Sequence, residues 1–186
     1  AGMSVTDERK KTINFSKAYM TEPARFFTLK SSPLSTFSSS KNLNLDDDGS
    51  ATAGTISSLN NALKGAKLGV TVATIHEDFA NSYLDTDLKI YPTQDEMNLD
   101  LAAGRIDAML CDVGTAEAFM GTAGGANVTT FGPNVFGGPL GEGVGAGIRQ
   151  SDTDLKAMFD KAIADAAADG TITKISMQWF GKDLAP

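Results

Sequence analysis

The chain is poor in residues that bind metals or change redox state. It contains one cysteine, Cys111, and one histidine, His76, among 186 residues. A single cysteine cannot form a disulfide within the chain, and one cysteine with one histidine cannot make a multi-Cys/His zinc site. We therefore expect no intrachain disulfide, no bound metal and no cofactor.

Long hydrophobic runs and a surplus of positive charge are also missing. No apolar run approaches the ~20 residues of a membrane-spanning helix, and residues 1–15 lack the apolar stretch of a signal peptide, so the chain is cytosolic, processed or incomplete at its start. The formal net charge is −7. Because nucleic-acid binding needs a surplus of Lys and Arg, we exclude nucleic acid as a partner, and an anionic membrane surface is a poor match.

Residues 67–132 carry a regular alternation of apolar runs and amphipathic stretches. The pattern predicts strands at 67–72, 88–91, 108–111 and 128–131, and helices at 77–84, 93–104 and 115–120. Thr74 with Glu77, and Thr93 with Glu96, have the spacing of helix-capping boxes. Strands that alternate with helices of about ten residues indicate crossover units. The predicted class is α/β, with a mostly parallel sheet.

The two ends of the chain and the segment 31–61 differ from this pattern. Amphipathic helices are predicted at 155–166 and 173–180, but only a strand-like start at 1–5 accompanies them. A doubly wound unit needs several strands to bury both faces of its sheet, so Met158, Phe159 and Trp179 should have too little sheet to pack on, which predicts missing partner structure at the front. Residues 31–61, rich in Ser, Asn, Asp and Gly, are predicted to form a long surface loop.

Two positions suit the binding of a small zwitterion. In open parallel sheets, ligands bind at the carboxyl ends of the strands. Thr74 opens a helix after one strand, and free N–H groups with the helix dipole suit a carboxylate there. Asp112 follows the strand at 108–111 and could bind an ammonium group. The alternatives stay open: Thr74 more commonly acts only as a cap, and Asp112 could equally cap the helix near Gly114.

Two further side chains are interpreted without a reactive role. Cys111 lies in an apolar strand and reads as an inert core thiol. His76 is not accompanied by a nucleophile motif, and acid–base catalysis would need a positioned partner.

Six blocks of sequence occur in a fixed order along the chain. They are Ser4–Ser16, with the pattern Ser-Val-Thr-x-x-Arg; Leu63–Val70; Tyr91–Glu96; Leu101–Ala108; Gly143–Gly145; and Asp169–Gly181. In these blocks the chain resembles the amino-acid-binding proteins of ABC importers, the bacterial extracellular solute-binding proteins of family 3. Residues 131–133 and 141–145 are most similar to the lysine/arginine/ornithine, histidine and opine branch.

The resemblance implies a periplasmic-binding-protein-like fold. Two doubly wound α/β lobes are joined by two crossing strands, near 22–29 and 144–149, and close on the ligand like a hinge. Residues 1–23 and 147–186 would form the remainder of lobe 1, and residues 24–146 lobe 2. The first part of lobe 1 is absent from this chain, so we expect a weakly folded or aggregating fragment.

The resemblance also implies a set of ligand contacts. Arg9 would hold the ligand α-carboxylate with its guanidinium fork, and Ser4 and the backbone around Gly2 would add hydrogen bonds. Thr74 would meet the same carboxylate from the other lobe, with Ile75 and His76 beside it. Asp112 would bind the α-ammonium group.

By the same resemblance the protein is a binding protein and not an enzyme. It would capture a polar or cationic amino acid or an opine, with arginine, lysine, ornithine, histidine and glutamine all open, and deliver it to an ABC permease in the inner membrane. We expect a periplasmic monomer. Two alternatives remain: a dehydratase on the same fold, with His76 or Glu77 as general acid, and a ligand-sensing module with a membrane or signalling segment.

Overall fold

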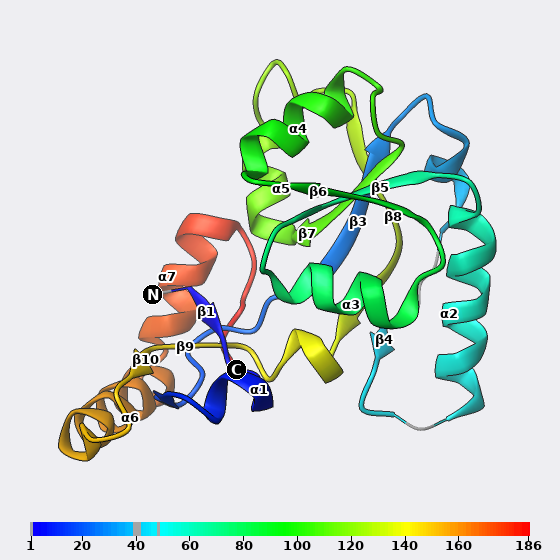
Figure 1. Ribbon diagram of the computed structural model, residues 1–186. Coiled ribbons are helices and arrows are strands. Elements are labelled where there is room, and N and C mark those ends of the chain that lie inside the picture. The colour runs from blue at the N-terminus through cyan, green and yellow to red at the C-terminus, as the bar shows by residue number, and fades with distance from the viewer. Residues whose placement is uncertain (1, 39–41, 48) are drawn as a thin grey trace. The chain divides into compact units, whose positions relative to one another are not determined.

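The computed structural model describes residues 2–38, 42–47 and 49–186 (Figure 1). Contacts divide the chain into two compact units. Unit 1 comprises Ala1–Glu22 and Leu140–Pro186, and unit 2 comprises Pro23–Pro139. The lobes expected from the sequence had boundaries at 23/24 and 146/147, and the identification of the units with these lobes stays a prediction.

Unit 2 is built on a mixed six-stranded sheet with the order β4-β8-β3-β7-β5-β6. The strands are β3 (Ala24–Leu29), β4 (Leu43–Asn44), β5 (Lys67–Thr71), β6 (Asp87–Tyr91), β7 (Ala108–Asp112) and β8 (Val128–Phe136). Only β3 runs against both of its neighbours, whereas the pairs β4–β8, β5–β6 and β5–β7 are parallel. The predicted mostly parallel α/β sheet is therefore confirmed, with β3 as the exception.

Helices cover both faces of this sheet. They are α2 (Ser50–Leu63), α3 (Ile75–Tyr83), α4 (Gln94–Ala102) and α5 (Val113–Met120), with short 3₁₀ turns η1 (Pro33–Thr36) and η2 (Gly138–Leu140). Figure 1 shows α4 and α5 on one side of the sheet and α2 and α3 on the other. The predicted caps are present, because Thr74 and Thr93 accept hydrogen bonds from the backbone N–H groups three residues on, at 3.3 Å each.

Strand β3 lies at the centre of the unit 2 core. Phe26 and Phe27 follow one another and so point to opposite faces, and both are fully buried. Phe27 packs in the cluster formed with α4 and α5, which includes Met97 and Leu101. The ring centroids of Phe26 and Phe131 are 5.5 Å apart. The segment 22–29, expected as a crossing between lobes, thus belongs from residue 24 onward to the sheet, because β7 and β8 pair with it on both sides.

The prediction of a long surface loop over residues 31–61 is wrong for its second part. Residues 50–63 form helix α2, and the preceding part holds η1 and β4, while residues 39–41 and 48 lie outside the described residues. Leu59 and Leu63 are fully buried, and Ile56 continues their spacing. Ser, Thr and Asn dominate the helix and are weak helix formers, which hid this short apolar stripe. Packing decides the conformation here, aided by Asn60, which donates to the Tyr83 carbonyl at 3.0 Å.

Unit 1 holds two small antiparallel ladders. Strand β1 (Met3–Ser4) pairs with β9 (Val144–Gly145), and β2 (Asn14–Phe15) pairs with β10 (Gly147–Ile148). Gly141 has φ +80°, and a Cβ atom there would lie 2.3 Å from the Val5 carbonyl oxygen. Glycine therefore allows the close approach that lets Val5 bond with residues 142 and 143 at 2.9 and 2.8 Å.

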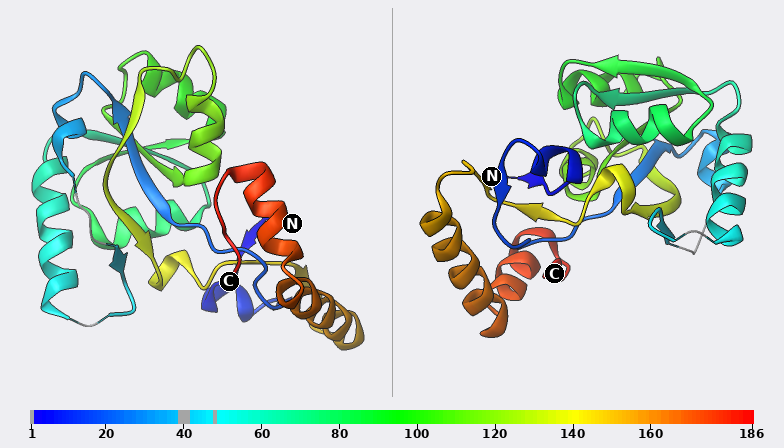
Figure 2. Two further views of the ribbon diagram at one scale, coloured as in Figure 1. Left: turned by 180° about the vertical axis from the view of Figure 1, so that it is seen from behind. Right: turned by 60° about the horizontal axis from the view of Figure 1, so that its bottom comes forward.

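The helices of unit 1 are α1 (Asp7–Lys10), α6 (Thr153–Ala168) and α7 (Thr171–Phe180). The two predicted C-terminal helices are thus confirmed. However, α6 buries none of its residues and α7 buries only Ser176. In both views of Figure 2, α6 extends away from the short strands of this unit.

Seven large apolar side chains of α6 and α7 are exposed to solvent, and we call them the α6–α7 apolar face. They are Leu155, Met158, Phe159, Ile175, Met177, Trp179 and Phe180. Trp179 is 74% exposed and Met158 63%. The prediction that these helices have too little sheet to pack on is confirmed.

Candidate ligand-binding site

The carboxyl ends of β5 and β7 lie at the same edge of the unit 2 sheet, because these strands are parallel neighbours. Strand β5 ends at Thr71 and leads through a tight turn into α3, whereas β7 ends at Asp112. Brought together in this way, the first turn of α3 and the Asp112 carboxylate are in contact: Nε2 of His76 lies 3.2 Å from Oδ1 of Asp112. The sheet edge expected to bind ligand therefore gathers the residues predicted in this unit.

The turn before α3 is strained. Ala73 has φ +56° and is the single non-glycine residue with a positive φ in the described part of the chain. This left-handed conformation costs an L-residue roughly 1–2 kcal/mol, and such outliers gather at functional sites. The backbone N–H of Ala73 donates to Oε2 of Glu77 at 2.6 Å, which holds the turn in place. The sequence contains no glycine here that would have signalled a positive φ.

Thr74 is a helix cap. Its hydroxyl donates to the Thr71 carbonyl at 2.7 Å and accepts from the N–H of Glu77 at 3.3 Å. The capping interpretation of Thr74 is therefore confirmed. A hydroxyl has one hydrogen to donate, so a hydrogen bond from Thr74 to a ligand carboxylate would replace the bond to the Thr71 carbonyl.

The next two residues of α3 leave backbone donors open. The N–H groups of Ile75 and His76 belong to the first turn, which has no acceptor within the helix, and they form no hydrogen bond with the residues that the structure describes. Both side chains are buried, which fixes this backbone. The open donors and the positive end of the helix dipole suit an anion.

Asp112 stands at the N-cap position of α5, but its carboxylate makes no capping hydrogen bond. The side chain is 42% exposed. The carboxylate is therefore available to a cation, and the alternative in which it serves as the helix cap is wrong. A carboxylate beside an anion-binding helix end is complementary to the two charges of an amino acid.

His76 is the buried ionisable member of the group. The residue is 5% exposed. Although Nε2 lies within ion-pair distance of Asp112, it makes no hydrogen bond in the described part of the chain. Nearly all buried polar groups in proteins are hydrogen-bonded, so this nitrogen needs an explanation. The contact of His76 with Asp112 could not be predicted from the sequence, because no local sequence pattern indicates that β5 and β7 are neighbouring strands.

Unit 1 holds the other predicted residues. Arg9 lies in α1, where Thr6 caps the helix by accepting from the Arg9 N–H at 3.3 Å. Nη1 of Arg9 donates to the Ser4 carbonyl at 3.0 Å, and the N–H of Gly2 donates to the Tyr19 hydroxyl at 3.1 Å. A guanidinium has five donors, so the Ser4 bond leaves Arg9 able to bind a carboxylate.

The predicted contacts thus form two groups, one in each unit. Unit 2 brings Thr74, Ile75, His76 and Asp112 together, and unit 1 brings Arg9 and Ser4 together with Gly2 nearby in the sequence. That both groups act on one ligand remains a prediction.

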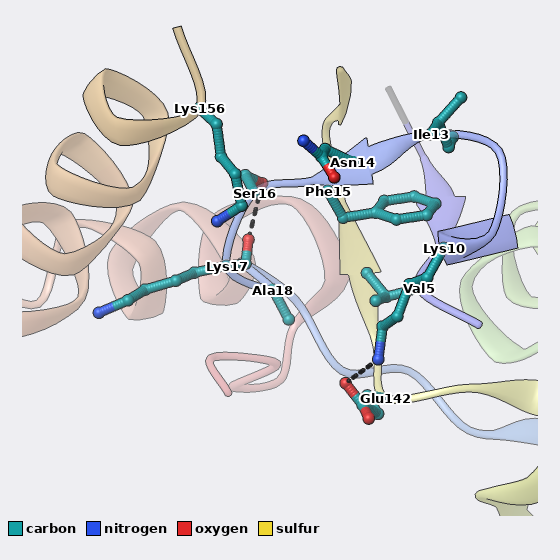
Figure 3. Close-up of a pocket in the computed structure, with 10 residues that line it drawn as sticks. All are labelled: Val5, Lys10, Ile13, Asn14, Phe15, Ser16, Lys17, Ala18, Glu142 and Lys156. Carbon is teal, nitrogen blue, oxygen red and sulfur yellow. Dashed lines mark hydrogen bonds and ion pairs between the residues drawn. The ribbon is translucent and has the colours of Figure 1, made fainter. Parts of the chain in front are cut away.

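Unit 1 also contains a pocket of about 370 Å³, shown in Figure 3. It is lined by Val5, Lys10, Ile13, Asn14, Phe15, Ser16, Lys17, Ala18, Glu142 and Lys156. Lys10 pairs with Glu142 at 3.0 Å, and this hydrogen bond raises the pKa of Lys10. Lys156 pairs with Asp160. None of the predicted ligand contacts lines the pocket, and its walls come from segments that only the fold brings together.

Within residues 2–38, 42–47 and 49–186, no group of three or more His, Cys, Asp or Glu could hold a metal ion. None of the helices described has the length and apolar character needed to cross a membrane.

Comparison with known proteins identifies the relatives of this chain. It is 30% identical to the L-arginine-binding protein of Pseudomonas aeruginosa over 189 residues, with 99% of this chain and 64% of that protein covered. It is 31% identical to the octopine-binding periplasmic protein of Rhizobium meliloti over 207 residues, with coverages of 100% and 70%. Both relatives are binding proteins by name.

A solved structure shows the same fold. The periplasmic His/Glu/Gln/Arg/opine family-binding protein from Silicibacter pomeroyi, in complex with lysine, matches with a TM-score of 0.71 at 26% identity, over 100% of this chain and 70% of that one. The chain spans about two thirds of the length of the curated relatives, 64% and 70% for the two named above. Residues 1–182 match the bacterial extracellular solute-binding proteins, family 3, and the chain belongs to this family of binding proteins, which are not enzymes.

Proposed function

We propose that this chain is part of the solute-binding component of an ABC importer and captures a polar or cationic amino acid or an opine. One observation carries the proposal: the N-terminus of α3, with its open N–H groups, lies beside the Asp112 carboxylate, which makes no capping hydrogen bond. Nε2 of His76, in the first turn of α3, is 3.2 Å from Oδ1 of Asp112. These two charges match the carboxylate and ammonium groups of an amino acid. The names of the relatives support arginine, lysine and octopine as candidate ligands.

Arg9 of unit 1 completes the carboxylate site in this proposal. Its planar fork binds a carboxylate through two parallel hydrogen bonds, which a lysine cannot reproduce. A ligand held by both groups favours the conformation in which both contact it, by its differential affinity for that state. No bond is broken, and the ligand leaves unchanged.

The proposed setting follows the relatives. A binding protein of an importer would work as a monomer in the periplasm and deliver its ligand to a permease in the inner membrane. The octopine-binding relative is periplasmic by name.

The enzyme alternative, with His76 or Glu77 as general acid, is weakened at the site for Glu77. A general acid would need a free proton donor near the ligand. The Glu77 carboxylate accepts the Ala73 N–H at 2.6 Å and is therefore occupied in holding the turn. We expect a bound ligand to be recovered chemically unchanged after prolonged incubation.

Thermal shift and titration calorimetry test the proposal. The protein is screened against the twenty amino acids, ornithine, octopine and nopaline. A ligand at one hundred times its Kd stabilises the folded state by about 2.7 kcal/mol, so a cationic amino acid or an opine should raise Tm clearly.

Three variants then locate the site. Asp112→Asn and Arg9→Lys should each weaken binding at least tenfold. Arg149→Lys is the matched control for Arg9→Lys, because Arg149 is an exposed arginine of unit 1, and it should leave binding unchanged. A full screen without any shift, or unchanged affinity in Asp112→Asn, would reject the assignment.

A further inference from the structure

His76 is the polar residue among the side chains that α3 buries in the core. Phe79 and Ala80 lie three and four residues further on, which places them on the same helix face, and they are 0% and 2% exposed. The imidazole is therefore fixed by the core of unit 2. An apolar side chain would fit this row without leaving a nitrogen unpaired.

Among the described residues, the unpaired nitrogen lies within ion-pair distance of Asp112. Nε2 lies 3.2 Å from Oδ1 of Asp112, a distance at which a donor and an acceptor can bond, but the two are not aligned for a hydrogen bond. The first turn of α3 carries two carboxylates of its own. Glu77 accepts the Ala73 N–H, and Asp78 is exposed. Because the Asp112 side chain is 42% exposed, it can rotate toward the ring, whereas the buried ring cannot move toward it.

We infer that His76 is a positioning residue for Asp112. The imidazole carries a proton on Nε2, and this N–H forms a hydrogen bond to Oδ1 of Asp112. The bond holds the carboxylate in one orientation and leaves Oδ2 for the ammonium group of the ligand. A carboxylate held in advance loses less conformational freedom when the ligand binds. The inference rests on the proposed function for its ligand, but the contact between His76 and Asp112 can be measured without one.

The ligand-free measurement uses the fact that His76 is the only histidine. Protein labelled with ¹⁵N-histidine gives the signals of one imidazole. We expect the tautomer protonated at Nε2 at pH 8, and we expect Asp112→Ala to shift these signals and mix the tautomers. Asp78→Ala, at an exposed acid of the same helix, is the control and should leave them unchanged. A ring protonated only at Nδ1, or unchanged signals in Asp112→Ala, would overturn the inference.

The binding measurement compares L-arginine with 5-guanidinopentanoate, which has no α-ammonium group. His76→Leu should weaken L-arginine binding about tenfold and leave the affinity for the deaminated analogue within twofold. His76→Gln, which restores a donor, should recover most of the loss and serves as the second variant if His76→Leu does not fold. Equal losses for both ligands would reveal a purely structural role. If the unaltered protein binds neither ligand, the proposed function fails for arginine, and the tautomer measurement alone decides the role of His76.

Discussion

Units 1 and 2 differ in what their helices pack against. In unit 2, four helices cover a six-stranded sheet, and Phe27 at its centre is fully buried. In the described part of unit 1, α6 and α7 accompany two-stranded ladders, and Trp179 is 74% exposed. Amphipathic helices occur in both units, with α3 in unit 2 and α7 in unit 1 as the clearest cases. An amphipathic pattern therefore predicts a helix and its apolar side, but the helix is stabilised only when another surface buries that side.

The same difference extends to the two halves of the candidate site. In unit 2 the first turn of α3 is held by the buried side chains of Ile75 and Phe79. In unit 1 the Arg9 guanidinium is held by one described bond, to the Ser4 carbonyl. We therefore expect the unit 2 half to be the more rigid of the two, since stability within a protein follows local burial.

The largest expected effect contrasts one aromatic residue from each unit. Phe27→Ala should lower the free energy of unfolding by about 3–5 kcal/mol, as is usual for a fully buried phenylalanine. Trp179→Ala should change it by less than about 0.5 kcal/mol, because its side chain is mostly in solvent. Urea unfolding followed by circular dichroism measures both. A comparable loss for Trp179→Ala would mean that the α6–α7 apolar face is covered in solution.

An intermediate effect separates capping from ligand binding within unit 2. Thr74→Ala and Thr93→Ala each remove a cap bond of 3.3 Å, so each should cost about 1 kcal/mol of stability. Only Thr74→Ala should also weaken binding of the ligand found by the thermal-shift screen, because Thr93 caps α4 instead. Calorimetry on both variants measures this, and identical affinities would limit Thr74 to its structural role.

The smallest expected effect is a change in the ionisation of Tyr91 in β6. Burial, and then the hydrogen bond to Asp100 at 2.7 Å, raise the pKa of Tyr91 from 10.0 to about 12. A pKa raised in the folded state stabilises the protein below pH 10 and is lost as the pH rises toward 12. An absorbance titration of the protein, which has three tyrosines, should show late ionisation of Tyr91, and Asp100→Asn should lower the pKa of Tyr91. Ionisation of all three near pH 10 would contradict the burial of this part of unit 2.

Local sequence patterns predicted most elements of unit 2 correctly. The strands at 67–72, 88–91 and 108–111 are found within a residue of their expected bounds, because apolar runs between capping boxes are local signals. The helix at 50–63 was missed, since Leu59 and Leu63 form a short stripe among weak helix formers. Its helical conformation depends on the packing of Leu59 and Leu63 in the core of unit 2, which the sequence of residues 50–63 alone does not predict.

The candidate site divides in the same way. The positions of Thr74 and Asp112 at strand ends followed from the pattern, and the resemblance added Arg9 and Ser4. The strain at Ala73 could not be predicted, because alanine carries no signal for a positive φ. That the two groups of predicted contacts act on one ligand rests on the resemblance alone, since the groups are far apart in the sequence.

The sequence by itself determined the α/β class, the caps at Thr74 and Thr93, the amphipathic faces of the C-terminal helices and the blocks of the family pattern. Each of these signals depends on residues that are close together along the chain. Only the tertiary structure decided that β3 runs against its neighbours at the centre of the sheet, that the Asp112 carboxylate does not cap α5, and that buried His76 faces it at 3.2 Å. The physical reason is that these contacts join segments whose neighbourhood is set by strand order, and strand order depends on how the whole sheet buries its faces.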